Sequence, residues 1–499
     1  MDRAAPGRGQ ASGTVREPAE MRDDLDRIGG EHDRRFAAGA GAGGLSAQLR
    51  SIFEQAVAAV DPAEAVDREL LPLAAAGHPL GRRCGVLAVG KGSLAMWRAA
   101  RAQLEPRRVW CAPHALVVSH VDTGEVPLSD GPDVLAGVIH RVAEHPVPGS
   151  GGVAAAAALE RAVGEWRCTG WLVLLSGGAS ALLPSPCPGI TLADKQRTTE
   201  LLLGSGASIE ELNTVRRHLS KLKGGGLARL LSPAPVLVLA VSDVVSGGLS
   251  ALASGPLTAD TTTFADALAI VRDRLGGRVP EAVLRLLEDG ARGELEENPG
   301  PGDPVFDRVE HRVVADNRLA VAAAAARCEE LGYRPVVAPH PLCGEASDAA
   351  RLVARAMQRA AERVVDAAEA SRRSGVALVF GGETTVTVRG DGLGGRNQEL
   401  ALAVALELER EPPRRPPDRP WALLAAGTDG RDGPTAAAGA VVDGDSLRKM
   451  RSAGVDPAVA LARNDSHRAH AAAGALFVTG ATGTNVADLT VALLPAPAG

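Results

Sequence analysis

The sequence predicts an α/β protein of two domains, the first a doubly wound, mostly parallel sheet and the second a mixed sheet with helices. From about residue 45, short apolar runs alternate with amphipathic stretches of helical period. The apolar runs have the length and composition of buried strands, and each ends in Gly, Ser, Asp or His. Since open α/β sheets bind ligands at the carboxyl ends of their strands, these polar ends are the candidate site.

The first domain is expected over residues 45–300, as a Rossmann-like unit. Residues 1–44 are rich in Gly, Ala, Arg and Asp and lack the apolar stretch of a signal peptide, so we expect a disordered N-terminal extension, with Met21 as an alternative start. The buried strands of this domain are expected at 86–90, 115–120, 171–178 and 236–243, with helical sequence between them.

The second domain is expected over residues 305–499, after a Pro- and Gly-rich linker at 296–307. Residues 375–390 are expected to form two strands, the second alternating polar and apolar residues in the antiparallel manner. The Pro- and Arg-rich tract at 409–420 is expected to be a surface loop. The other strands are expected at 311–316, 334–339, 421–430, 438–443, 475–480 and 486–494.

Length, composition and charge narrow the class of protein. A chain of 499 residues with 45% hydrophobic and 23% charged residues has material for two soluble domains. The net charge of −6 and the lack of a basic run with interleaved aromatics argue against nucleic-acid binding. No apolar run reaches membrane-spanning length, so no membrane partner is expected. The six scattered cysteines indicate reduced thiols and a cytoplasmic protein.

The stretch GVLAVGKG at 85–92 is close to a nucleotide-binding P-loop but fails as one. Gly92 stands where the P-loop has the Ser or Thr that binds Mg²⁺, and the residues between Gly85 and Gly90 belong in a strand. What remains is Lys91, between a buried strand and a helix. A surface lysine is the alternative, but its place at a strand end favours contact with a phosphate or carboxylate.

Two glycine-rich turns also suggest anion binding. In LLSGGASALLPSP (174–186), successive backbone N–H groups after a strand can form an anion-binding nest, although such turns are often only tight turns. GDGLGG (390–395) matches the dinucleotide fingerprint by letter, but the strand before it alternates and no acid follows at the required distance. The helix after it begins with Arg396, whose planar fork of donors suits oxyanions; a polar helix start is the alternative.

Three acids follow predicted strands. Asp429 and Asp432 lie in the tight loop GTDGRDGPT (427–435), where paired acids are Mg²⁺ ligands or bases in phosphoryl transfer, or ordinary turn formers. Asp243 ends the strand at 236–243.

Nine segments, in this order, resemble the ATP-dependent glycerate 2-kinase family, whose C-terminal portion is called MOFRL. The resemblance covers most of residues 45–495 and implies transfer of the γ-phosphoryl group of ATP to the 2-hydroxyl of D-glycerate with Mg²⁺, in a cleft between two α/β domains. The segments are AVGKGSLAM, EHPVP (144–148), LSGGASALL, LNTVRRHLSKLKGGGLA (212–228), SDVVSGGLSALASGP (242–256), GGETTVTVRGDGLGGRNQELALA (381–403), GTDGRDGPTAAAGAVVD (427–443), NDSH (464–467) and TGATGTNVADL (479–489).

The resemblance also implies roles for single residues. By position, Lys91, Arg396 and Asp243 are expected to be catalytic. Charge neutralisation by lysine, arginine and Mg²⁺ is what phosphoryl transfer needs, and glycerate adds a carboxylate that needs a cation. The residues expected to bind substrate or phosphate are Ser176, Gly177, Gly178, Ser180 and Asn397, and those expected to bind metal are Asp429 and Asp432. The partners expected are D-glycerate and ATP, and a homodimer is left open.

The sequence departs from the family pattern near several of these residues. The family has an acid shortly after Ser-Asp-Val, whereas this chain reads Val245-Ser246-Gly247-Gly248. A second acid is lost at Ala436, where the family has Pro-Thr-Asp, and the other departures are Ala179, His467 and Ala481. Loss of acids would weaken metal binding, change the substrate or mark a drifted, non-catalytic paralogue. The retained Lys91, Asp243, Arg396 and Asp429 favour an active kinase. The other alternative, an oxidoreductase of the hydroxypyruvate reductase type, needs a dinucleotide site, and the match at 390–395 is in the wrong context.

Overall fold

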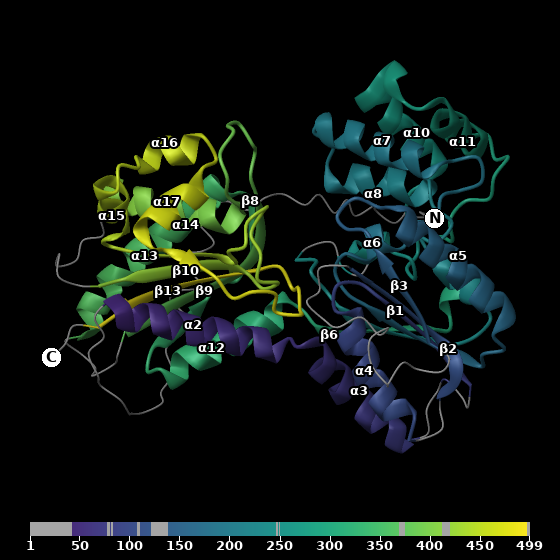
Figure 1. The fold of residues 1–499 in the computed structure, drawn as a ribbon, viewed down its shortest axis with the longest axis horizontal. Coiled ribbons are helices and arrows are strands. Elements are labelled where there is room, and N and C mark those ends of the chain that lie inside the picture. Colours follow the sequence, from purple (N-terminus) through teal and green to yellow (C-terminus); the bar gives the residue numbers. More distant parts are fainter. Residues whose placement is uncertain are drawn as a thin grey trace, which may run out of the picture. The chain divides into compact units, whose positions relative to one another are not determined.

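The protein is described from a computed structural model (Figure 1). The expected N-terminal extension lies almost wholly outside the described residues, as do most of the 409–420 tract and Ser246 and Gly247. The described residues are 42–76, 80, 83–106, 110–120, 138–245, 248, 250–368, 375–411 and 420–496.

The first sheet has six parallel strands in the order β3-β2-β1-β4-β5-β6, the order of a doubly wound fold. The predicted fold class of this domain is therefore confirmed. The strands span Cys84–Val89 (β1), Trp110–His120 (β2), Val138–Ala143 (β3), Gly170–Leu175 (β4), Val236–Val241 (β5) and Val309–Ala315 (β6). All four strands expected before residue 300 are present, and β3 was not anticipated.

Helices cover both faces of this sheet, because its strands are apolar on both sides. Val86 and Ala88 of β1 pack in one apolar cluster with residues of α3 and α4, while Leu87 and Val89 pack in another with residues of α5, α6 and α9. This alternation explains why the strands are continuous apolar runs. The helices span Pro62–Ala76 (α3), Ser93–Leu104 (α4), Ser150–Glu165 (α5), Ala179–Leu182 (α6) and Gly226–Leu231 (α9).

Four further helices form a small helical cluster with an apolar core of its own. They precede and follow β5 in the chain, so they are insertions at the carboxyl edge of the first sheet. They span Leu192–Gly204 (α7), Ile209–His218 (α8), Phe264–Leu275 (α10) and Glu281–Ala291 (α11), and short 3-10 turns lie at Leu252–Ser254 (η1), Gly276–Arg278 (η2) and Pro304–Phe306 (η3).

The second sheet is mixed, as predicted. Its order is β12-β11-β10-β13-β9-β7, with β8 paired to β9; β7 and β8 are parallel to β9, and the other pairs are antiparallel. The strands span Arg334–Val337 (β7), Leu342–Glu345 (β8), Gly375–Thr385 (β9), Ala422–Gly427 (β10), Gly439–Asp443 (β11), Leu476–Phe477 (β12) and Asp488–Pro495 (β13).

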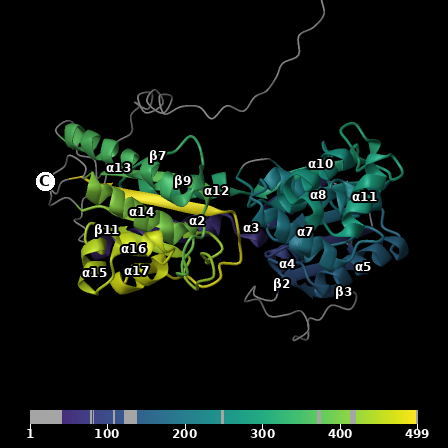
Figure 2. The ribbon, with the colours of Figure 1, turned by 90° about the horizontal axis from the view of Figure 1, so that it is seen from above.

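Two helices lie side by side on one face of the second sheet, α2 and α12, and the remaining helices cover the other (Figures 1 and 2). Ala422 and Leu424 of β10 face the first pair, and Leu423 and Ala425 face the others. The helices span Ala42–Ala59 (α2), Asn317–Glu330 (α12), Ala346–Ala368 (α13), Arg396–Arg410 (α14), Ser446–Ser452 (α15), Pro457–Ala462 (α16) and Ser466–Ala473 (α17).

Three elements differ from expectation. Strand β6 was expected to open the second domain, but it pairs with β5 and completes the first sheet. Helix α2 precedes the whole first domain in sequence and yet packs on the second sheet. Residues 375–390 hold one strand, β9, because the segment after Thr385 finds no strand partner and continues as a loop.

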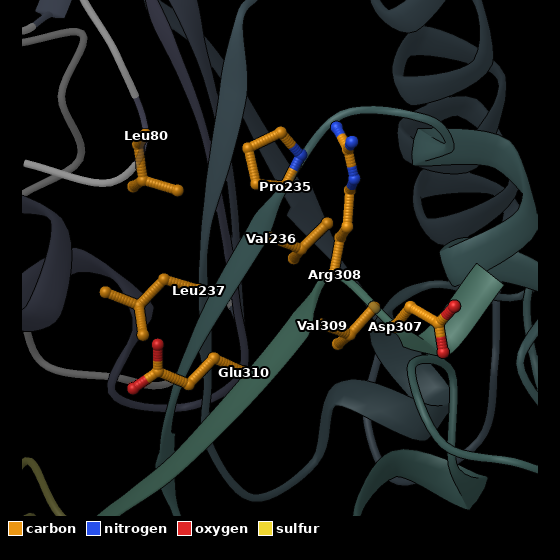
Figure 3. A pocket seen from close by; sticks show the side chains of 8 residues that line it. All are labelled: Leu80, Pro235, Val236, Leu237, Asp307, Arg308, Val309 and Glu310. Atoms are coloured by element: carbon orange, nitrogen blue, oxygen red, sulfur yellow. The ribbon is translucent and has the colours of Figure 1, made fainter. Parts of the chain in front are cut away.

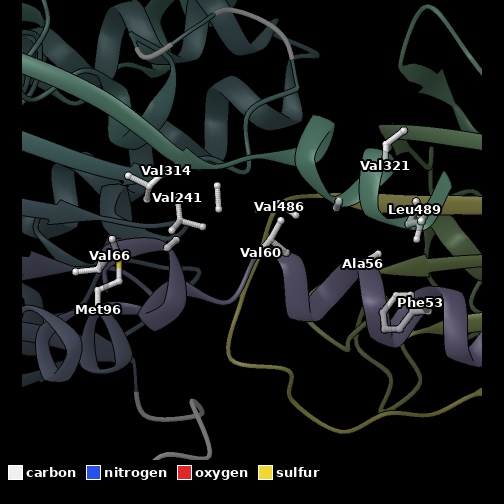
Figure 4. Packing of buried hydrophobic residues seen from close by; sticks show 14 of the residues in the cluster. Phe53, Ala56, Val60, Val66, Met96, Val241, Val314, Val321, Val486 and Leu489 are labelled. Carbon is white, nitrogen blue, oxygen red and sulfur yellow. The ribbon is translucent and has the colours of Figure 1, made fainter. Parts of the chain in front are cut away.

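One apolar cluster runs without a break from the first sheet to the second (Figure 4). Val66 and Met96 belong to it on the side of the first sheet, and Phe53 and Leu489 on the side of the second. Helices α2 and α3 follow one another directly, so they carry the core between the two sheets. In the described part of the chain, no helix is long and apolar enough to cross a membrane.

Candidate active site

The strand order of the first sheet reverses between β1 and β4, and the loops after these two strands therefore open a crevice. The loop after β1 carries Lys91, and the loop after β4 carries Ser176, Gly177 and Gly178. Lys91 and the glycine turn, which lie some 85 residues apart in sequence, are thus brought together by topology alone.

Hydrogen bonds lock the two loops together. The backbone N–H of Lys91 donates to the Gly177 carbonyl (2.9 Å), and the N–H of Gly92 donates to Ser176 Oγ (3.0 Å). Ser176 is buried, and its own N–H donates to the Val89 carbonyl (3.0 Å). Ser176 therefore holds the loops, whereas the N–H groups of Gly177 and Gly178 have no protein acceptor in the described part of the chain.

The glycines are required by what lies against them. A Cβ on Gly177 would overlap Asp243 Oδ2, and one on Gly178, whose φ is 86°, would lie 3.0 Å from the His145 ring and 3.5 Å from Lys91 Cγ. Asp243 follows β5 and His145 follows β3. Four strand ends of the first sheet therefore meet around this turn.

The second sheet brings Asp429 and Asn485 to the same place. Lys91 Nζ donates to Asp429 Oδ2 at 3.1 Å, with both side chains about a quarter exposed (28% and 23%). Asn485 Nδ2 donates to Asp243 Oδ2 at 3.4 Å. Asp429 follows β10, and Asn485 lies in the loop before β13.

Arg396, the first residue of α14, is held by two carboxylates. Its Nε and Nη2 donate to Asp488 (2.6 and 3.0 Å), and its Nη1 donates to Glu383 (2.8 Å). A guanidinium has five N–H groups, so two remain for a ligand. The side chain is 34% exposed, which leaves it accessible. Asp488 is buried, so Arg396 is also the counter-charge of an internal acid.

Asp432 and Asn397 lie beneath this arginine and are 2% and 1% exposed. The Asp432 carboxylate accepts the backbone N–H groups of Asn397 (3.0 Å) and Gln398 (2.9 Å) and both of their side-chain amides (3.2 and 2.9 Å). Gly395, the residue before α14, has no side chain to cap the helix. Asp432 therefore caps α14 from a distant loop, where a negative charge is stabilised by the helix dipole.

Burial and charge shift the titration of the central groups. Burial raises the pKa of the Asp243 carboxyl from its ordinary value, although the positive charges of Lys91 and Arg396 act in the opposite direction. Burial, together with the charge of Lys91, lowers the pKa of His145 to about 4. Burial likewise raises the pKa of Glu383, against the charge of Arg396. His145 is consequently neutral at pH 7.

The donor set suits Mg²⁺ only together with a ligand. No group of three or more His, Cys, Asp or Glu side chains in the described residues is placed to hold a metal by itself. Mg²⁺ is usually held by one or two carboxylates plus substrate phosphates, and Asp429, which is partly exposed, fits that pattern. Asp432 is buried and bonded to four N–H groups, so it offers no open oxygen.

Sequence reasoning had not assigned roles to His145, Asn485, Glu383 or Asp488. All four lie in or beside the segments that carry the family resemblance, and that is the one signal that could have indicated them. Ser180 lies two residues after Gly178, in α6, and has a separate set of partners.

A small pocket elsewhere does not belong to this site (Figure 3). It is lined by residues at the amino ends of β5 and β6, among them Val236 and Val309, together with Leu80. Lys91 lies at the carboxyl edge, so the pocket is on the opposite edge of the sheet.

Comparisons with known proteins find related families, sequences and a related structure. The chain matches a domain of unknown function (DUF4147) over residues 48–288 and the MOFRL family over residues 376–488. A D-glycerate 2-kinase from Thermotoga maritima is 36% identical over 446 residues, which are 89% of this chain and 97% of that protein. The crystal structure of glycerate kinase from Thermotoga maritima superposes with a TM-score of 0.74 at 35% identity and covers 90% of this chain and 99% of that one.

A relative with another name matches equally well. It comes from Agrobacterium vitis, is 39% identical and covers 89% of this chain and 94% of its own length. Its name gives hydroxypyruvate reductase as an unproven function.

Proposed function

The chain belongs to the glycerate kinase family, and we propose that it transfers the γ-phosphoryl group of ATP to the 2-hydroxyl of D-glycerate, giving 2-phosphoglycerate and ADP. The observation that supports this most directly is that Lys91 and Asp243 both lie against the glycine turn after β4, while the charge of Arg396 acts on Asp243. Phosphoryl transfer is mainly positioning and charge neutralisation, and these groups supply both.

Lys91 and Arg396 neutralise the transferring group. The Lys91 ammonium has three N–H donors, of which one is on Asp429, and Arg396 keeps two N–H groups beyond its carboxylates. The N–H groups of Gly177 and Gly178 add neutral donors beside them. Donors that are fixed before the reaction stabilise the charge on the phosphoryl oxygens without a reorganisation cost.

Asp243 takes the proton of the substrate hydroxyl. The 2-hydroxyl oxygen attacks the γ-phosphorus, the bond from phosphorus to the ADP oxygen breaks, and the hydroxyl proton passes to the Asp243 carboxylate. Because burial raises the pKa of Asp243, its carboxylate accepts a proton more readily than a solvated one. Asn485, which donates to Oδ2, orients that carboxylate.

Asp429 is the carboxylate that would hold Mg²⁺ together with the nucleotide phosphates, and the ion would supply further neutralisation of phosphate charge. Asp432 and Asn397 are given a positioning role, because they fix the first turn of α14 and hence the backbone of Arg396. The family has an acid shortly after Asp243 that this chain lacks, but none of the contacts described above depends on that position.

The oxidoreductase alternative depends on the glycine motif at 390–395, and the packing of that motif argues against it. The glycines of 390–395 are packed against protein: a Cβ on Gly390 or Gly392 would overlap the backbone at Arg463 or Asp465, and one on Gly395 would overlap Asp432. The loop is therefore filled by neighbouring segments and offers no backbone to a pyrophosphate.

The proposal is tested by one coupled assay. Purified protein with ATP, Mg²⁺ and D-glycerate is expected to release ADP, and the product is expected to carry phosphate on O2, as identified by phosphorus NMR. Release of 3-phosphoglycerate, or ligand binding without ADP release, would contradict it. Hydroxypyruvate with NADH or NADPH is the control and is expected to give no oxidation.

A further inference from the structure

A second group of cations lies just beyond the glycines, around Ser180, which is two residues after Gly178. Arg216 Nη2 donates to Ser180 Oγ (2.9 Å), and Lys223 Nζ donates to the same Oγ (2.6 Å) and to the Ser180 carbonyl (2.9 Å). Arg216 belongs to α8, and Lys223 lies in the turn that follows that helix. Two cations from one segment thus converge on a hydroxyl beside the proposed site.

This group has no carboxylate to balance it in the described part of the chain. Arg216 and Lys223 form no ion pair there, and a third cation, Lys195, donates to the Leu219 carbonyl (2.6 Å). The adjacent Arg217 differs, because it pairs with Asp260 at 3.3 Å. Burial of cations without anions is costly, so this arrangement needs compensation from elsewhere.

The titration behaviour agrees with that geometry. Burial, and then the charge of Arg216, lowers the pKa of Lys223 well below its ordinary value. Burial also lowers the pKa of Lys195 to about 7 and that of Arg216 below its usual range. The charge of Arg216 contributes to the lowered pKa of both lysines, as happens when a positively charged site has no anion in it.

Backbone strain helps to hold the group. Ala253 and Ser254 are non-glycine residues with φ of 55° and 61°, in the left-handed region, and they follow one another. This conformation brings the Ala253 carbonyl to Lys223 (3.4 Å) and Ser254 Oγ to Ser180 Oγ (3.0 Å). Strain of this kind persists where the surroundings impose it, and it gathers at functional sites.

Part of this group of side chains is accessible to solvent. Lys223 is 4% exposed, but Arg216 and Ser180 are partly exposed. Arg216 has one N–H on Ser180, so the rest of its planar fork suits two oxygens of one anion. Ser180 is two residues from Gly178, which lies against Lys91, so an anion here would be a neighbour of the reacting group.

We propose that Arg216, supported by Lys223 and Ser180, forms an oxyanion subsite for the non-reacting anionic group of a substrate, either the carboxylate of glycerate or a phosphate that stays on the nucleotide. The inference rests on the proposed function only for the identity of the molecule that carries the anion. That the subsite binds an oxyanion is argued from the residues themselves. The subsite binds and does not take part in the transfer itself.

The test compares Arg216→Gln with Arg216→Lys and with the control Lys221→Gln. Lys221 is a surface lysine of the same segment that has its own carboxylate, Glu160 (2.6 Å). Arg216→Gln is expected to raise KM for one substrate at least tenfold, with KM for the other and kcat changed less than threefold. Arg216→Lys is expected to give a KM between those of the parent and Arg216→Gln, because lysine keeps the positive charge but lacks the planar guanidinium group. Lys221→Gln is expected to match the parent.

The identity of the substrate affected gives the source of the anion: D-glycerate for a carboxylate, ATP for a phosphate. Unchanged KM for both substrates in a folded Arg216→Gln variant would overturn the proposal. If that variant does not fold, Arg216→Lys and Ser180→Ala carry the same comparison, and unchanged KM in both would overturn it.

A binding measurement separates this inference from the proposed function. Thermal stabilisation of the protein by inorganic phosphate, ADP or D-glycerate is recorded without turnover. Loss of at least one of these stabilisations in Arg216→Gln supports the subsite, even if the parent protein does not phosphorylate glycerate. Equal stabilisation of parent and variant by all three probes would overturn it, even if phosphorylation is confirmed.

Discussion

At the scale of single residues, Lys91 and Arg396 have different surroundings although both are expected to contact the transferring group. Lys91 shares a partly exposed ion pair with Asp429, and pairs of that kind contribute little to stability. Arg396 balances the buried Asp488, so its removal would leave an uncompensated buried charge, which is destabilising. Sequence reasoning treats the two cations alike. The structure indicates that replacing Lys91 changes the free energy of unfolding little, whereas replacing Arg396 lowers it.

Lys91→Ala is therefore expected to lower kcat by about 10²–10³-fold, the usual effect of losing one donor to a developing oxyanion. Its melting temperature is expected to stay close to that of the parent, because the ion pair that it loses is partly solvated. Steady-state kinetics and thermal melts measure the two effects. Lys449→Ala, which removes an exposed lysine from a pair with Asp443, is the matched control for activity. Activity of Lys91→Ala within threefold of the parent would remove Lys91 from the mechanism.

At the scale of elements, the first turn of α14 holds the site together from behind. Asp432 caps it from a loop 35 residues away, and α17 docks beneath it through His470, whose Nε2 lies 2.8 Å from the Gln398 carbonyl. The helix itself could be predicted from its apolar period and its arginine from the glycine loop. Its cap and its docking partner could not, because both come from segments that only the tertiary fold brings near.

The docking of α17 predicts a pH dependence of stability. Burial lowers the pKa of His470 to about 4, since protonation would add a second N–H at Nδ1, a buried atom without a hydrogen-bond partner among the described residues. Between about pH 6.5 and 4 the unfolded chain binds the proton and the folded chain does not. The free energy of unfolding is thus expected to fall as the pH falls through this window, by about 3 kcal/mol from this group.

Urea unfolding at a series of pH values measures this slope. His470→Gln keeps a side-chain donor for the Gln398 carbonyl but cannot titrate, so it is expected to flatten the decline. His467→Gln, on the same helix, is the control for loss of a histidine. A decline between pH 6.5 and 4 that is as steep in His470→Gln as in the parent would show that another group causes it.

At the scale of the whole molecule, the sequence predicted most strands, the mixed nature of the second sheet and the strand ends that hold Lys91, Gly177 and Asp243. Those predictions succeed because they depend on local pattern and on the rule that ligands bind at carboxyl ends of parallel strands. The position of β6 and the docking of α2 could not be predicted. The local pattern shows that a strand is apolar and that a helix is amphipathic. Which sheet the strand joins, and which apolar face the helix covers, depend on the tertiary structure.

The docking of α2 makes stability depend on a residue far from the site. Phe53 is 1% exposed and packs edge-on against Phe477 of β12, with ring centroids 5.1 Å apart, inside the cluster that is continuous across both sheets. Phe53→Ala is expected to lower the free energy of unfolding by about 3–5 kcal/mol. Because one core joins the sheets, urea unfolding followed by circular dichroism is expected to remain a single transition that shifts to lower urea. Leu71→Ala, which truncates an exposed side chain on the neighbouring α3, is expected to shift it by less than about 0.5 kcal/mol. A second transition confined to the Phe53 variant would mean that α2 holds the second sheet independently of the first.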